Sequence, residues 1–294
     1  MSHPKSSRKA RPGRIQLACA DFAFPLLPHP AALDVVAALG FQGVDVGFFE
    51  GRSHVQPSAA LRRPAAAARA LRTACEDRGL AIADLFLIPG ASLLDLSPNH
   101  PETAIRTKSR DRFERSLAFA QACGAGHFTT IPGMPWPGET RSRSFARCVD
   151  EMAWRCDRAT AAGMPFCIEP HVTSIVEKPS QVLALIAEVP SLRIALDSGQ
   201  FAIQGPGSAD FMPLIPFTIH AHARGGCKGN IQAVAAENTI DFPSLVAALK
   251  DHGYTGWICL EYVWVADGHC NRVDNLSETI LLRDVLRKAL RPAR

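Results

Sequence analysis

Residues 165–171 read Pro-Phe-Cys-Ile-Glu-Pro-His, a short apolar run that ends in a polar side chain. The pattern recurs in Ile194-Ala195-Leu196-Asp197, Thr218-Ile219-His220-Ala221-His222 and Trp257-Ile258-Cys259-Leu260-Glu261. Short apolar runs separated by helix-length segments are typical of buried parallel strands. A carboxylate or imidazole at the end of such a strand is costly unless something there uses it. We therefore predict that one divalent metal ion is bound by Glu169, Asp197, His222 and Glu261.

The rest of the chain alternates short β-like runs with longer helical ones, many of which stop at a glycine. Further strands are predicted at 15–21, 43–49, 80–88 and 127–131, and helices at 31–39, 64–78, 108–123, 141–162, 179–188, 242–252 and 275–290, with a weakly helical link near 208–215. Eight such units in 294 residues predict an α/β fold, a single-domain (β/α)8 TIM barrel. The open doubly wound alternative lacks a Gly-x-Gly-x-x-Gly motif after its first strand.

Composition supports one globular unit, since 47% of residues are apolar and 20% are charged. Residues 1–14 carry five basic side chains and no acid, which predicts a disordered basic tail followed by a barrel over 15–294. The remainder has 27 basic and 28 acidic residues, a net charge of −1. A nearly neutral body argues against a nucleic-acid partner, and the apolar runs are too short to span a membrane.

Nine cysteines form no Cys-x-x-Cys pair, and several lie within predicted strands or helices. This pattern favours reduced, mostly buried thiols over a disulfide framework, and it predicts a cytoplasmic protein.

Side chains two apart on a strand share a face, so Glu169 and His171 point the same way, as do His222 and Arg224. The predicted ligands suit Mn²⁺ first, with Mg²⁺, Co²⁺ and Zn²⁺ as alternatives. A metal so held can polarise the carbonyl of a hydroxy-ketone and stabilise an enediolate. Glu169 and Glu261 then serve as acid and base, and the carbon that regains the proton decides between epimerisation and aldose–ketose isomerisation.

Candidate substrate-binding residues surround these ligands. His171 and Arg224 fit substrate contact and structural hydrogen bonding equally well, and His54, after the second strand, is a weaker case of the same kind. Trp136, in a Pro- and Gly-rich loop, could stack on a sugar or simply pack. His220 is an alternative to His222 as a ligand, or a supporting histidine behind it.

These strand ends resemble the sugar phosphate isomerase/epimerase family, part of the xylose-isomerase-like TIM barrel superfamily, over residues 15–290. The resemblance is carried by Ile168-Glu169-Pro170-His171, Ala195-Leu196-Asp197-Ser198-Gly199, His220-Ala221-His222-Ala223-Arg224 and Gly253-Tyr254-Thr255-Gly256-Trp257 running into Leu260-Glu261-Tyr262. It implies that Glu169, Asp197, His222 and Glu261 hold the metal, that the glutamates are the acid/base pair, and that the substrate is a small keto-sugar or polyol. It also makes a homo-oligomer plausible.

Two departures from the family pattern bear on the substrate. Gln200 stands where relatives commonly carry a histidine, so it can hydrogen-bond a hydroxyl but cannot act as an acid. Similar epimerases follow the strand-seven histidine with Gly-Glu and a later arginine, whereas this chain has Ala223-Arg224-Gly225-Gly226 and Lys228. The alternatives are a lyase or dehydratase of a keto-inositol or keto-glycoside, a non-catalytic sugar-binding barrel, and an abasic-DNA endonuclease.

Overall fold

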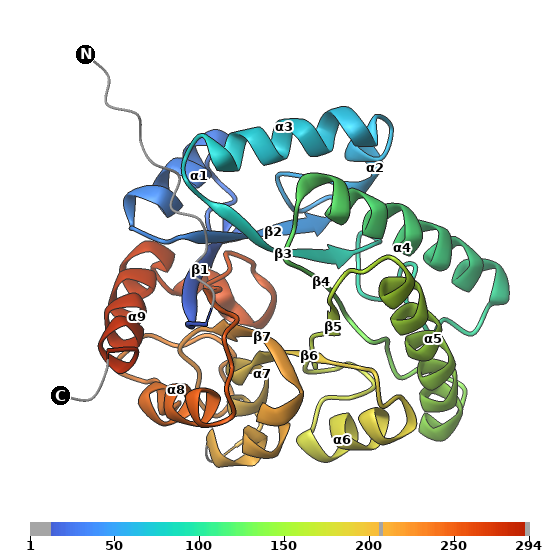
Figure 1. The fold of residues 1–294 in the computed structure, drawn as a ribbon. Coiled ribbons are helices and arrows are strands. Elements are labelled where there is room, and N and C mark those ends of the chain that lie inside the picture. Colours follow the sequence, from blue (N-terminus) through green and yellow to red (C-terminus); the bar gives the residue numbers. More distant parts are fainter. Residues whose placement is uncertain (1–12, 206–207, 292–294) are drawn as a thin grey trace.

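The computed structural model describes residues 13–205 and 208–291, so most of the predicted basic tail lies outside the described residues. Eight parallel strands pair in sequence order, and β8 returns to pair with β1, which closes the sheet into a barrel. Figure 1 looks into this barrel and shows helices arranged around the strands. The predicted single-domain (β/α)8 TIM barrel is confirmed.

The strands lie close to their predicted positions. They are β1 (Gln16–Ala20), β2 (Gly43–Phe49), β3 (Ala81–Ile88), β4 (His127–Thr130), β5 (Phe166–Ile168), β6 (Ile194–Asp197), β7 (Thr218–Ala223) and β8 (Trp257–Leu260). Their residues are almost all buried, which explains why they read as apolar runs without alternation.

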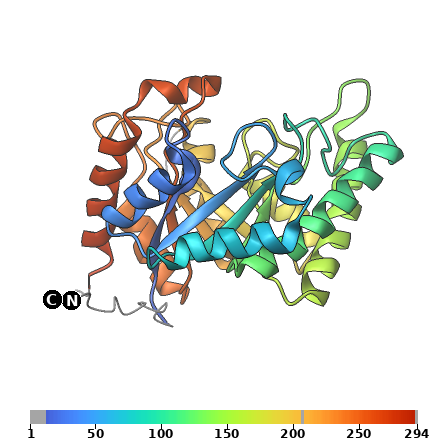
Figure 2. The same ribbon diagram turned by 90° about the horizontal axis from the view of Figure 1, so that it is seen from above.

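The helices enclose the strands, with α5 and α9 on opposite sides of the barrel in both views (Figure 2). The α-helices are α1 (His29–Ala38), α2 (Pro57–Ala60), α3 (Pro64–Glu76), α4 (Thr103–Cys123), α5 (Arg141–Ala161), α6 (Pro179–Glu188), α7 (Ser198–Ala202), α8 (Phe242–Asp251) and α9 (Asn275–Ala289). The 3-10 segments of the described residues are η1 (Asp21–Ala23), η2 (Ser208–Phe217) and η3 (Asp267–Arg272).

Helices α2, α4 and α7 differ from the prediction, and α2 is a single short turn that was not predicted. Helix α4 begins at Thr103, five residues before the predicted start at Lys108, because Arg106 Nη1 donates to the carbonyl oxygens of His100 and Pro101 and fixes the first turn. Helix α7 was not predicted, since it is a single short turn that contains Gly199, a poor helix former. It starts directly where β6 ends.

Aromatic side chains pack the layer between helices and barrel. Phe48 of β2 stacks on Phe119 of α4 at 4.9 Å, and Phe113 of α4 lies 5.3 Å from both Phe128 and Phe166.

Eight of the nine cysteines are buried. Within the described ranges, each helix is too short or too polar to cross a bilayer.

Candidate metal centre

Three of the predicted ligands meet at the carboxyl-terminal end of the barrel. Glu169 follows β5, His222 lies near the end of β7, and Glu261 follows β8. His222 Nδ1 is 2.8 Å from Glu169 Oε1 and 3.1 Å from Glu261 Oε2. All three side chains are buried, and one coordinating atom of each lies within 4.8 Å of the others. We call this group of three the metal centre.

Burial and mutual charge give the members of the metal centre different acidities. Burial, reinforced by the Glu261 carboxylate, raises the pKa of Glu169 to about 7. Burial also acts to raise the pKa of Glu261, but the attraction of His222 and Arg224 outweighs it, so this pKa lies below its ordinary value. Although burial opposes it, the carboxylates around His222 raise its pKa well above the usual range. Near neutral pH, Glu169 is therefore partly protonated while Glu261 is ionised.

The metal centre suits a divalent cation. Ligand atoms that bind one ion at 2.0–2.2 Å in an octahedral arrangement lie about 3 Å apart, and both separations from His222 Nδ1 agree with this spacing. One imidazole nitrogen and carboxylate oxygens are a donor set for Mn²⁺, Co²⁺ or Zn²⁺, and for Mg²⁺ where oxygen dominates. A bound cation would also compensate two buried carboxylates. Glu169, His222 and Glu261 would hold it.

Asp197, the fourth predicted ligand, has other partners. Its Oδ1 accepts a hydrogen bond from the Gly199 backbone N–H at 2.8 Å and caps α7. Its Oδ2 accepts from Arg224 Nη2 in a buried ion pair. The same Nη2 lies 4.0 Å from Glu261 Oε2. Asp197 therefore borders the metal centre through Arg224, and both of its oxygens already accept hydrogen bonds.

The loop after β5 carries His171 beside the metal centre. Its Nδ1 is 2.5 Å from the Val172 carbonyl oxygen, and burial lowers the pKa of His171, so the imidazole is neutral. Gln200 of α7 accepts from the Val172 N–H at 2.9 Å, which fastens this loop to α7. The Nε2 atom of Gln200 is buried and has no hydrogen-bond partner among the described residues. Gln200 thus keeps one donor for a further acceptor.

Two other predicted substrate-binding residues have neighbours of their own. Trp136 Nε1 donates to Asn99 Oδ1 at 3.1 Å, and its ring packs edge-on against His100 at 4.3 Å. The His54 ring stacks on His29 at 4.9 Å. These contacts favour a packing role for Trp136, while substrate contact by His54 stays a prediction.

Three polar side chains lie behind the metal centre, inside the barrel, and form what we call the interior layer: Asp45 of β2, Asp84 of β3 and His220 of β7. All are fully buried, and together with His222 they offer four coordinating atoms within 4.8 Å of one another. Sequence reasoning missed Asp45 and Asp84 because it considered only strand ends. The signal was a carboxylate in the middle of an apolar strand, as in Gly43-Val44-Asp45-Val46.

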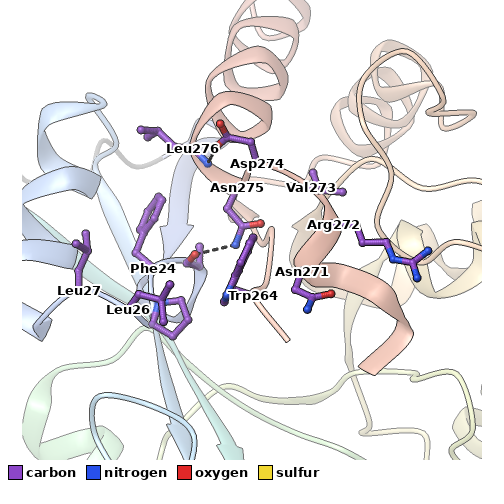
Figure 3. A pocket seen from close by; sticks show the side chains of 12 residues that line it. Phe24, Leu26, Leu27, Trp264, Asn271, Arg272, Val273, Asp274, Asn275 and Leu276 are labelled. Atoms are coloured by element: carbon purple, nitrogen blue, oxygen red, sulfur yellow. Dashed lines mark hydrogen bonds between the residues drawn. The ribbon is translucent and has the colours of Figure 1, made fainter. Parts of the chain in front are cut away.

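An apolar pocket of about 430 Å³ lies apart from the metal centre, between the segment after β1 and the segment that leads into α9 (Figure 3). Leu26 and Trp264 line it and remain 79% and 39% exposed. Asn275 Nδ2 closes one side by donating to the carbonyl oxygens of Ala23 and Tyr262. None of the predicted metal ligands lines this pocket, so its shape does not report on the metal centre.

Comparison with known proteins agrees with this architecture. The family model described as "Xylose isomerase-like TIM barrel" matches residues 33–286. Among solved structures, a D-psicose 3-epimerase from Clostridium cellulolyticum H10 superposes with a TM-score of 0.75 at 15% identity, covering 95% of this chain and 100% of that one. A 3-keto-D-glucoside 4-epimerase from E. coli gives 0.71 at 14% identity, covering 94% and 100%.

A probable 3-DHS dehydratase from Bacillus anthracis is similar as well, with a TM-score of 0.65 at 14% identity, covering 92% of this chain and 99% of that one. At these identities the likeness shows the fold. No curated protein matches the sequence.

Proposed function

Because the chain belongs to the xylose isomerase-like TIM barrel family, we propose that it is a divalent-metal-dependent isomerase or epimerase of a small keto-sugar or polyol-derived ketone. One observation carries the proposal: His222 Nδ1 lies between the carboxylates of Glu169 and Glu261, at the end of the barrel where the chemistry of this fold takes place. Both the epimerases and the dehydratase among the structural neighbours are consistent with a site of this kind.

The two glutamates suit proton transfer at carbon. A divalent ion in the centre, Mn²⁺ foremost, would stabilise the negative charge that develops on a substrate carbonyl oxygen. Glu261, with its lowered pKa, is the base that takes a proton from the neighbouring carbon, and the electron pair moves toward the carbonyl. Glu169, with a pKa of about 7, returns a proton from the other side. Return to the same carbon inverts it. Return to the former carbonyl carbon isomerises the sugar, provided that the hydroxyl proton of the deprotonated carbon moves to the former carbonyl oxygen.

Polar groups around the centre would orient the substrate. Gln200 Nε2 has a free donor, the His171 imidazole is neutral, and Arg224 supplies a fixed positive charge. We propose these three as substrate-binding residues, with His54 further out and Trp136 as a packing residue of its loop. Asp197 is proposed as the fourth ligand once Arg224 has released it.

Elimination is the second candidate, because the same proton abstraction can expel a β-hydroxyl or β-glycosyl group. The dehydratase among the neighbours favours keeping it. We expect the substrate to be a small molecule, since a net charge of −1 over residues 15–294 does not favour DNA binding. We expect the enzyme to work in the cytoplasm because its thiols are free and mostly buried. The exposed apolar side chains of Leu26 and Trp264, at the edge of the apolar pocket, are compatible with contact between subunits of a homo-oligomer.

Two measurements test the proposal. Mass spectrometry of purified protein should find about one divalent metal per chain, lost in the Glu169→Gln/Glu261→Gln double variant. Mn²⁺-loaded protein in D₂O should incorporate deuterium into a keto-sugar such as D-psicose, D-tagatose or D-fructose, whereas a non-catalytic binding protein would not. An α,β-unsaturated ketone product would identify elimination. Failure to bind Mn²⁺, Co²⁺ or Zn²⁺ after reconstitution would refute the proposal.

A further inference from the structure

The interior layer needs a physical explanation, because the inside of a TIM barrel is normally filled with branched apolar side chains. Asp45, Asp84 and His220 are each 0% exposed. Burying ionisable groups costs free energy that must be offset by partners. Asp84 has one, since it accepts from Thr129 Oγ1 at 2.9 Å. The question is what the Asp45 carboxylate does.

One oxygen of Asp45 faces two imidazoles of β7. Asp45 Oδ2 is 2.6 Å from His220 Nε2 and 3.4 Å from His222 Nε2. The short contact with His220 is a direct hydrogen bond and fixes the carboxylate in place. The longer one is a charge contact and not a hydrogen bond, since His222 Nε2 has no hydrogen-bond partner among the described residues, and it is the closest approach of a carboxylate to that nitrogen. Asp45 thus lies on the side of His222 opposite to the metal centre.

We propose that Asp45 is a positioning residue that prepares His222 to bind a metal, an inference that rests on the proposed function. A neutral imidazole carries its proton on one nitrogen and binds a metal through the other. When Nδ1, which faces Glu169 and Glu261, gives up its proton to bind a metal, the remaining proton lies on Nε2, and the Asp45 carboxylate near it favours this tautomer and ring orientation. His220 acts one step further back, by holding Asp45.

The same side chains, together with His222, also match the donor set of a second metal site, and two observations argue against an ion there. The 2.6 Å between His220 Nε2 and Asp45 Oδ2 is shorter than the roughly 3 Å expected between neighbouring ligands of one ion, whereas the 2.8 Å and 3.1 Å separations from His222 Nδ1 are close to it. The interior layer is also sealed, whereas the side chains of Glu169 and Glu261 keep 2% and 5% exposure. The contacts therefore favour orientation of His222 over a second ion.

The test compares Asp45→Asn with Asp84→Asn, a matched control that removes another fully buried carboxylate of the same layer. Mn²⁺ affinity is measured by calorimetry, and urea unfolding of the metal-free proteins reports on the fold. Both variants should lose stability, but only Asp45→Asn should weaken Mn²⁺ binding, by about 10- to 100-fold. Asp45→Glu, which keeps the carboxylate, should recover part of the affinity and serves as the second variant if Asp45→Asn does not fold.

Equal Mn²⁺ affinity in wild type and the Asp45 variants would overturn the inference while leaving the proposed function intact. Two ions per wild-type chain, with one lost in Asp84→Asn, would overturn it in favour of a second metal site. A wild-type chain that binds no metal would overturn both the inference and the proposed function.

Discussion

Arg224 forms a buried ion pair with Asp197, the one predicted metal ligand that lies apart from the other three. Its Nη2 is also 4.0 Å from Glu261 Oε2. Burial acts to lower the pKa of Arg224, but Asp197, Glu261 and Glu169 raise it above its ordinary value, so the guanidinium stays charged. A positive charge is thus fixed at the border of a site proposed to bind a cation, and the two cations compete for the same carboxylates.

Replacing Arg224 should therefore strengthen metal binding. Two unit charges about 5 Å apart at an effective dielectric constant of 20 repel by about 3 kcal/mol, which is about 100-fold in affinity, and Mn²⁺ carries two charges. We therefore expect Arg224→Gln to tighten Mn²⁺ binding by about 100-fold or more in calorimetry. Lys228→Gln removes an exposed positive charge of the same β7 loop and should leave the affinity unchanged. Weaker Mn²⁺ binding in Arg224→Gln would mean that the arginine supports the site.

Metal binding should release fewer protons as the pH rises. His222, with its strongly raised pKa, loses a proton on binding at either pH, and Glu169, with a pKa of about 7, loses one at pH 6 but is already ionised at pH 8. Calorimetry in buffers of different ionisation enthalpy should give about one proton fewer at pH 8 than at pH 6, together with tighter binding. The difference should vanish in Glu169→Gln, and its persistence there would assign the titration to another group.

Gln200 should affect the substrate and not the metal. Gln200→Leu removes the free Nε2 donor and leaves the Val172 N–H without its acceptor. We expect kcat/KM to fall about tenfold, the cost of one or two hydrogen bonds, with unchanged Mn²⁺ affinity. Gln204→Leu, at an exposed position four residues later, is the control. A parallel loss of metal binding in Gln200→Leu would show that α7 positions the metal centre as well.

Stability should depend strongly on Glu151, a buried carboxylate of the helical layer that pairs with Arg155 and also with Arg106 and Arg110. Arg155 Nη1 is 2.5 Å from Glu151 Oε2, both in α5, and each side chain is at most 3% exposed. Glu151→Ala leaves the arginine charge buried without its partner, so urea unfolding should show a loss of about 3–5 kcal/mol. Glu114→Ala breaks the exposed pair with Arg158 and should cost less than about 1 kcal/mol. Similar costs for both would contradict this account.

The sequence was sufficient to predict the barrel because its strands are short, apolar and separated by helices. It also predicted that Glu169, His222 and Glu261 come together, since the carboxyl ends of parallel strands meet at one end of a barrel. The partner of Asp197 was not predictable in this way. Its ion pair with Arg224 joins residues 27 positions apart and depends on the rotamer of a long side chain beyond β7.

Asp45 was missed for a different reason. Its role depends on contacts across the barrel, from β2 to β7, that link residues 175 positions apart. Strand pairing runs around the barrel wall, so neighbouring strands follow from their order in the chain. Contacts across the interior depend instead on the tilt of the strands and on which side chains share a level, and a single sequence does not specify these.

The pairing of strands around the barrel is uneven. Strands β2 and β3 pair along the whole length of β2, whereas β5 and β6 are in register only at Ile168 and Ile194. Local opening is easiest where the fewest backbone hydrogen bonds must break, so hydrogen exchange should be fastest at this seam. Glu169 and Asp197 lie at the carboxyl-terminal end of this seam. If Asp197 exchanges Arg224 for an ion, the part of the barrel wall that must adjust is therefore also the part that opens most easily.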